Sequence, residues 1–302
     1  MNSDFALRLL LVALLIFPSW GFAEGRLILE DDTAVSERIL KLLEKAANQE
    51  SAAQADLGLS YVLGEGVTQD IQTGLKLLHQ AARRGELSAY AKLGYIYREG
   101  LGVPKDYVTA AEWFQRGAEQ NDAASQVSLA TLYLHGEGVQ QNDNSALSWF
   151  SRAATQGHAS AQTGLGYMYE HGKGVSQNYS MALSWYRKGA LQGDASGQTQ
   201  LAMLYYNGRG VTRNFHAARA WFERAAEQGD DVAQRHLGEM HESGKGVAPN
   251  WAMAYMWYSL AAAQNTAAES YKNRLGSKLT QYQLIEAEWR MDNWWEQHHR
   301  GE

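Results

Sequence analysis

The chain has 302 residues, and its 27 Lys and Arg against 33 Asp and Glu give a formal net charge of −6. This mildly acidic balance, with no basic run, excludes an electrostatic case for binding nucleic acid or an anionic membrane. The chain has no cysteine, so disulfides, thiolate metal sites, a thiol nucleophile and a lipid-modified cysteine are excluded as well.

Residues 1–23 are predicted to be a secretory signal peptide. Arg8 precedes an apolar run over residues 9–17, and the small residues Gly21 and Ala23 have the spacing of a cleavage site. The apolar run is about half of the ~20 residues that a membrane-spanning helix needs. We therefore expect the mature chain to be exported, to the periplasm or alternatively to the exterior, and to keep no stable membrane anchor.

Residues 24–50 are expected to form a linker and a capping helix. The segment "SERILKLLEKAANQ", which starts at Ser36, has the pattern of one isolated helix of the units that follow. A helical cap with a polar outer face is what a repeat protein needs at its end to remain soluble.

Residues 51–265 contain six copies of a Gly-x-Gly-Val segment. The second glycines recur at a constant step of 36, at Gly66, Gly102, Gly138, Gly174, Gly210 and Gly246. A dinucleotide-binding loop occurs once and follows a strand, whereas a helical pattern precedes every copy here. We interpret the segment as the turn between the two helices of a repeated hairpin, and we expect no cofactor.

The second helix of each unit carries signals at both ends. Asp or Asn is expected to cap its start at Asp70, Asp106, Asn142, Asn178, Asn214 and Asn250. Gly or Asn in the left-handed conformation is expected to end it at Gly85, Asn121, Gly157, Gly193, Gly229 and Asn265. Between these ends a tryptophan column is predicted to form the core between stacked hairpins, at Trp113, Trp149, Trp185, Trp221 and Trp257.

The first helix of each unit has apolar residues at i, i+3 and i+4, as on one face of an α-helix. A recurring leucine in this stripe is followed by a small residue, which is glycine at Gly58, Gly94, Gly166 and Gly238. Glycine costs a helix interior about 1 kcal/mol relative to alanine. Its return at this column therefore indicates a neighbouring helix that approaches closely.

Residues 266–302 are predicted to form C-terminal capping helices. Thr280 and Gln283 have the spacing of a capping box. They would open a helix that runs to about residue 298 and carries Trp289, Trp294 and Trp295.

The repeated pattern resembles the Sel-one-like repeat (SLR) family, α/α solenoids related to the tetratricopeptide repeats. The motif is seen in "AQTGLGYMYEHGKGVSQNYSMALSWYRKGALQGDASGQ", from Ala161 to Gln198, with Gly197 where the family usually has Ala. The resemblance implies an all-α fold, a right-handed superhelical solenoid of six 36-residue hairpins with helical caps. It also implies a protein-binding scaffold rather than an enzyme.

The residues that could carry chemistry do not form a recognisable site. His135 and His171 occupy equivalent positions about 10 Å apart, too far to share a zinc ion that lies ~2 Å from each ligand. His236 and His241 are five residues apart, not the four of a zinc-protease helix, and we interpret the histidines as solvent-facing. The sequence has no Gly-x-Ser-x-Gly and no Ser-x-x-Lys motif. We expect no metal site and no catalysis.

One surface of the first helices varies from unit to unit and is the predicted partner-binding site. Its residues are Lys92, Tyr95, Glu99, Thr131, His135, Tyr167, His171, Met203, Tyr206, Asn207 and Glu239. In relatives of this architecture the first helices line the concave side. We therefore predict a non-catalytic scaffold or adaptor of the cell envelope that binds a protein partner there.

Two alternatives remain open. In a glycan- or peptidoglycan-binding module, Tyr95, Tyr167 and Tyr206 would serve as stacking platforms. In a hydrolase, the active site would be assembled from residues of distant repeats.

Overall fold

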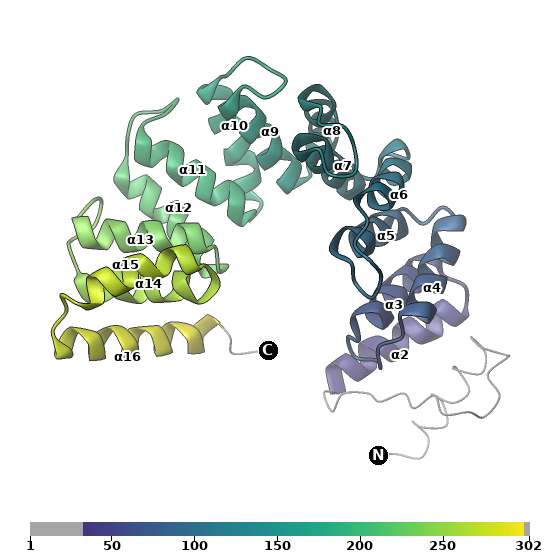
Figure 1. Cartoon of the computed structure of the whole chain (residues 1–302), viewed down its shortest axis with the longest axis horizontal. Helices are drawn as coiled ribbons and strands as arrows, with labels where there is room; N and C mark the ends of the chain where they lie inside the picture. Colours follow the sequence, from purple (N-terminus) through teal and green to yellow (C-terminus); the bar gives the residue numbers. More distant parts are fainter. Residues whose placement is uncertain (1–32, 299–302) are drawn as a thin grey trace. The chain divides into compact units, whose positions relative to one another are not determined.

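The computed structural model describes residues 33–298, so the predicted signal peptide lies outside the described residues. Within this part every regular element is an α-helix (Figure 1). The helices outside the six hairpins are α2 (Thr33–Ala47), α15 (Thr266–Gly276) and α16 (Gln281–His298). No helix in this range is long and apolar enough to cross a membrane.

Six hairpins, each made of a first and a second helix, follow one another along the chain. The first helices are α3 (Ser51–Leu63), α5 (Leu87–Glu99), α7 (Ala123–His135), α9 (Ala159–His171), α11 (Ala195–Asn207) and α13 (Asp231–Ser243). The second helices are α4 (Ile71–Arg83), α6 (Tyr107–Glu119), α8 (Asp143–Thr155), α10 (Tyr179–Leu191), α12 (Phe215–Glu227) and α14 (Trp251–Gln264). The all-α solenoid predicted from the sequence is confirmed.

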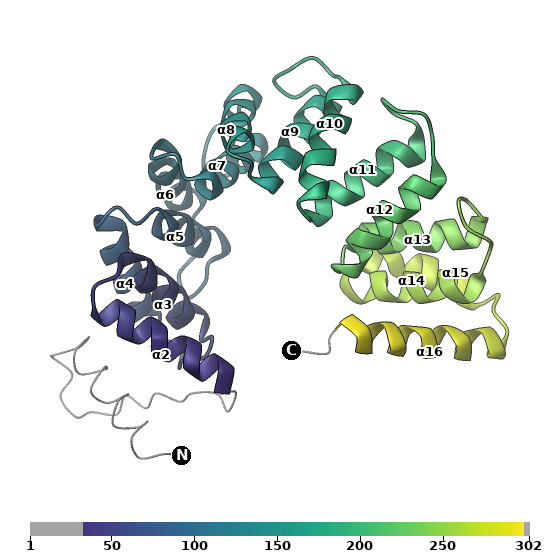
Figure 2. The same ribbon diagram turned by 180° about the vertical axis from the view of Figure 1, so that it is seen from behind.

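The described residues form two compact units, and the boundary between them along the chain falls within α8. Of the described residues, unit 1 contains 33–153 and unit 2 contains 154–298. In each unit a first helix lies beside its own second helix, and successive hairpins stack, as the two opposite views show (Figures 1 and 2).

The Gly-x-Gly segments form the turns, as predicted. The first glycine of each segment ends the first helix in the left-handed conformation, and the second glycine also has a positive φ, as at Gly136 and Gly138. A Cβ added at Gly138 would lie 2.1 Å from the carbonyl oxygen of Tyr107, in the first turn of the preceding repeat's second helix. The second glycine therefore serves the packing between repeats as well as the turn.

The predicted capping residues are found at the start of every second helix. The Asp70 side chain accepts from the backbone N–H of Thr73 at 3.0 Å. Equivalent bonds occur at Asp106, Asn142, Asn178, Asn214 and Asn250. The predicted left-handed ends are confirmed at Gly85, Asn121, Gly157, Gly193 and Gly229.

The predicted left-handed end at Asn265 is wrong. Its φ of −138° is extended, because the residue begins the next helix at once. Its side chain accepts from the backbone N–H of Ala267 at 2.9 Å and so caps α15.

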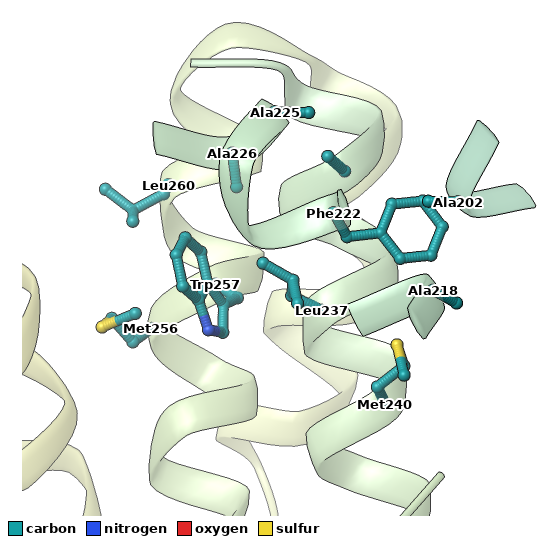
Figure 3. Packing of buried hydrophobic residues seen from close by; sticks show 11 residues of the cluster. Ala202, Ala218, Phe222, Ala225, Ala226, Leu237, Met240, Met256, Trp257 and Leu260 are labelled. Atoms are coloured by element: carbon teal, nitrogen blue, oxygen red, sulfur yellow. The ribbon is translucent and has the colours of Figure 1, made fainter. Parts of the chain in front are cut away.

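The tryptophan column occupies the outside of the core rather than its centre. Only Trp257 is buried, with 7% of its surface exposed. The other four are partly buried, and the fully enclosed ring belongs to the next residue, at Phe114, Phe150, Tyr186, Phe222 and Tyr258. Figure 3 shows Phe222 and Trp257 in one such cluster of unit 2, with Leu237 and Met240.

The glycines of the first helices make room for these enclosed rings. A Cβ at Gly94 would lie 2.4 Å from the Phe114 ring, and one at Gly238 would lie 2.5 Å from the Tyr258 ring. The predicted close approach is confirmed.

Each of the four partly buried tryptophans of this column has a cation over its ring, three residues further along the helix. The distances from the cation to the ring centroid are 4.6 Å for Arg116 on Trp113, 4.5 Å for Arg152 on Trp149, 3.8 Å for Lys188 on Trp185 and 4.5 Å for Arg224 on Trp221. Such contacts contribute about 0.5–1 kcal/mol at exposed sites. They cover the outer faces of rings that would otherwise be exposed to water.

A buried side chain near the start of most first helices connects each repeat to the one before it. Gln126 donates from Nε2 to the carbonyl of Ala118, eight residues earlier, at 3.1 Å. Gln198 and Gln234 make the same bond, and Gln54 makes it to Ala46 of the capping helix α2. In the second repeat the position is Tyr90, whose hydroxyl donates to the carbonyl of Ala82 at 2.9 Å.

Helices beyond the hairpins cover both ends of the repeat array. In unit 1, α2 packs against α3 through Ile39, Leu43 and Ala46. In unit 2, α15 and α16 pack against α14. The predicted capping box is present: Thr280 N–H donates to Gln283 Oε1 at 3.0 Å, and Gln283 N–H donates to Thr280 Oγ1 at 3.3 Å.

Candidate interaction surface

In unit 1 the predicted binding residues begin on α5. Lys92 forms a 2.9 Å ion pair with Asp56, the equivalent residue one repeat earlier on α3. Neighbouring first helices therefore present this column to the same side. Tyr95 is 40% exposed, and the guanidinium of Arg98 lies 5.5 Å from its ring centroid. Glu99 is exposed and pairs with Arg98 at 2.6 Å.

The next first helix, α7, carries two further predicted residues. Thr131 is partly buried, and its hydroxyl donates to the carbonyl of Val127 at 2.9 Å. The hydroxyl proton is therefore already used in a hydrogen bond within the helix. His135 is exposed at the last position of the helix. The unit 1 surface therefore combines one exposed aromatic ring with charged and polar neighbours.

In unit 2, Tyr167 and His171 contact each other on α9. Their ring centroids are 4.2 Å apart, and His171 Nδ1 lies 3.1 Å from the carbonyl oxygen of Tyr167. Tyr167 also packs against the core cluster that contains Tyr186 and Leu201. Part of its ring thus has a structural role.

Further along unit 2, Tyr206 and Glu239 line the same hollow, of about 280 Å³. Its other lining residues are Glu242, Ser243, Lys245, Tyr258, Tyr271 and Arg274. Two neighbouring predicted residues do not line this unit 2 hollow: Met203 is partly buried against the core, and Asn207 is exposed at the end of α11.

The unit 2 hollow is closed by its own polar contacts. Both terminal nitrogens of Arg274 lie 2.6 Å from the Glu242 carboxylate, which also accepts from the Tyr258 hydroxyl at 2.9 Å. The hydrogen bond from Arg274 is the main reason that the pKa of Glu242 falls below its usual value. Lys245 donates to the Tyr206 hydroxyl at 3.0 Å and lies over its ring.

Glu239 is similarly engaged. It pairs with Arg235 and lies 3.0 Å from Nδ1 of His236. Burial by itself raises the pKa of Glu239, but the hydrogen bond from His236 and the charges of His236 and Arg235 outweigh burial and lower it. The charged groups of this hollow are therefore already used in holding α13 and α15.

The interpretation of the histidines as solvent-facing is wrong for His236 and His241, which are 7% and 8% exposed. His236 stacks on Phe222 with ring centroids 5.0 Å apart. Burial, reinforced by the charges of Arg219 and Arg290, lowers the pKa of His241 to about 4. Residues 33–298 contain no group of three His, Asp or Glu side chains that could hold a metal ion.

The three tyrosines considered as glycan platforms are differently placed. Tyr95 belongs to the exposed residues, whereas Tyr167 and Tyr206 are partly buried. Tyr206 has Lys245 over its ring and meets Phe215 edge-on at 5.2 Å. Of the three, Tyr95 offers the most accessible ring.

The repeat geometry agrees with a comparison against known protein families. The Sel1 repeat matches six consecutive segments, residues 51–86, 87–122, 123–158, 159–194, 195–230 and 231–266. The chain belongs to the Sel1 repeat family. Sel1 repeat proteins generally serve as scaffolds for protein interactions rather than as enzymes.

Two solved structures share this fold. A Sel1 repeat protein from Oxalobacter formigenes is 28% identical with a TM-score of 0.68, and the match covers 86% of this chain and 97% of that one. A Pseudomonas aeruginosa protein is 20% identical with a TM-score of 0.50, over 71% of this chain and 81% of its own. A search of curated proteins found no match.

Proposed function

We propose that this Sel1 repeat protein is a non-catalytic scaffold of the cell envelope that binds a protein partner on its first helices. The family's general role in protein interactions supports the scaffold function. The predicted signal peptide supports the envelope location.

The observation that carries the proposed surface is the exposure of Tyr95. Its ring lies outside the core clusters, next to the Lys92–Asp56 and Arg98–Glu99 pairs. The equivalent positions in the other repeats hold Leu59, Thr131, Tyr167, Met203 and Glu239, so the fold does not require an aromatic residue there. Tyrosine and arginine are enriched where proteins bind each other, relative to the rest of the surface.

A photocrosslinking amino acid placed at position 95 tests this surface in the cells that produce the protein. The matched control is the same substitution at Val108, which is 57% exposed at the start of the second helix α6. We expect a single envelope protein to be captured from position 95 and not from position 108. Equal capture from both positions, or no capture from 95, would contradict the proposal, and capture of glycan alone would favour the glycan-binding alternative.

The envelope location has its own test. N-terminal sequencing of the protein from fractionated cells should show a chain that starts after Ala23 and is recovered outside the cytosol. An intact Met1 on protein found entirely in the cytosol would contradict the export.

A further inference from the structure

A second hollow lies in unit 1, away from the first-helix surface, between the second helices of the first two repeats. It has a volume of about 520 Å³. Its lining residues are His79, Ala82 and Arg83 of α4, Tyr90 of α5, and Trp113, Arg116, Glu119 and Gln120 of α6. We call it the unit 1 hollow.

Three rings form one wall of the unit 1 hollow. The Trp113 ring lies 5.3 Å from His79 and 6.2 Å from Tyr90, measured between centroids. Tyr90 is fixed by its hydrogen bond to Ala82 and is only 9% exposed. Arg116 lies 4.6 Å from the centroid of Trp113. The hollow therefore offers an apolar surface with a cation beside it.

The cations of the unit 1 hollow are not paired. Among the described residues, the Arg83 guanidinium makes no hydrogen bond or ion pair, and the Arg116 guanidinium contacts only the Trp113 ring, while the Arg116 carbonyl accepts from Gln120 Nε2. The one carboxylate, Glu119, accepts from the Gln115 side chain instead. Burial, followed by the charges of Arg83 and Arg116, lowers the pKa of His79, so this ring is neutral near pH 7. Two positive groups and one negative group leave an excess of positive charge.

The combination of Arg83 and Tyr90 occurs once in the repeat array. The residues equivalent to Arg83 at steps of 36 are Glu119, Thr155, Leu191, Glu227 and Ala263. Tyr90 stands where other repeats have Gln54, Gln126, Gln162, Gln198 and Gln234. Because glutamine makes the same hydrogen bond to the preceding helix, the fold does not require Tyr90. The arginine and the tyrosine thus give the unit 1 hollow a local chemistry that the repeat itself does not need.

We propose that the unit 1 hollow binds an acidic side chain on a peptide segment of a protein partner. The carboxylate would pair with Arg83 and Arg116, and an adjacent apolar side chain would lie on Trp113 and Tyr90. A small free anion fits less well, because exposed ion pairs alone contribute only about 0–1 kcal/mol. An occupant that also covers the rings gains the apolar contact that aromatic surfaces provide. The proposal rests on the proposed scaffold function in one respect, which is that the occupant is a protein.

A random decapeptide library displayed on phage and selected on the immobilised full chain tests this proposal. The library is first depleted on the Arg83→Gln, Arg116→Gln double variant, so that peptides bound elsewhere are removed. We expect the enriched peptides to carry Asp or Glu next to Leu, Phe, Tyr or Trp. Enrichment of sequences without an acidic residue, or no enrichment after depletion, would overturn the proposal.

The affinity of the best enriched peptide, labelled with fluorescein, is then measured by fluorescence polarisation for the wild type and for each variant. We expect Arg83→Gln and Tyr90→Gln each to weaken binding about five- to tenfold, as for loss of a charge-assisted bond or of aromatic contact. Arg224→Gln removes the equivalent of Arg116 in unit 2, and this matched control should leave binding unchanged.

Two results would overturn the site. One is unchanged binding in both Arg83→Gln and Tyr90→Gln variants that keep the wild-type circular dichroism spectrum. The other is displacement of the peptide by succinate at concentrations similar to those of the unlabelled peptide, which would identify a site for small anions. The crosslinking test concerns Tyr95. Failure of the unit 1 hollow proposal would therefore leave the proposed binding surface on the first helices unaffected.

Discussion

The unit 1 and unit 2 hollows contain similar residues, but their charges are used differently. In the unit 2 hollow, Glu242 is held by Arg274 and Tyr258, and Lys245 contacts Tyr206. In the unit 1 hollow, the Arg83 guanidinium has no partner among the described residues, and that of Arg116 contacts only a tryptophan ring there. The first arrangement holds helices together, whereas the second leaves charge available. The pairing of charges, rather than their number, separates a structural hollow from a candidate binding site.

The largest expected loss of stability follows from removing the enclosed ring of Tyr258 in the unit 2 hollow. Tyr258→Ala should lower the free energy of unfolding by about 3–5 kcal/mol, because the ring is fully buried against Gly238. Tyr258→Phe keeps the ring and loses the bond to Glu242, so it should cost only about 1 kcal/mol. Urea unfolding followed by circular dichroism measures both, and a cost below 1 kcal/mol for alanine would show that the ring is not part of the core.

Substitution in the wall of the unit 1 hollow should lower the stability of the protein less. Trp113→Ala should cost about 1–2 kcal/mol in the same urea experiment, since only part of the side chain is buried. A loss as large as that of Tyr258→Ala would mean that Trp113 supports the core, and the unit 1 hollow could not then be regarded as an open surface.

The Arg274–Glu242 pair should give a pH-dependent effect. Arg274→Gln should cost about 1 kcal/mol at pH 7, because the pair is partly exposed. Arg274 lowers the pKa of Glu242 in the folded state, so the stabilisation is present above the unfolded pKa of about 4.3 and is lost as the pH falls through the folded pKa. Thermal unfolding of both proteins between pH 7 and pH 3 should show the gap closing on the acid side. A gap that is constant with pH would mean that the pair does not contribute through charge.

The smallest stability effect is expected at Arg83. Arg83→Gln should change the free energy of unfolding by less than about 0.5 kcal/mol, as is usual for a surface substitution without partners. A loss above 1 kcal/mol would reveal a structural contact and would remove the contrast between the two hollows.

The repeat and its turns could be predicted from the sequence because their determinants are local. An Asp or Asn that caps a helix, such as Asp70, needs only the N–H groups two or three residues further on. A glycine with positive φ, such as Gly138, is recognisable from its place after a helical pattern. Both features recur every 36 residues, so each copy supports the others.

The features that depend on contacts between helices could not be predicted in the same way. Trp149 and Phe150 are adjacent and both aromatic, and only the packing decides which ring is enclosed. The role of Asn265 depends on α15, which follows at once and does not repeat the earlier pattern. The two hollows likewise combine residues from three or more helices. A comparison of each repeat with its neighbours could have revealed Tyr90, because it interrupts a glutamine column.

The measurement that tests the scaffold account most directly is the affinity of the captured partner for the Tyr95→Ala variant. We expect binding to weaken at least about tenfold, as for an aromatic residue central to an interface. The thermal unfolding midpoint should stay close to that of the wild type, since Tyr95 lies outside the core. Unchanged affinity in the folded variant would contradict the claim that the first helices bind the partner.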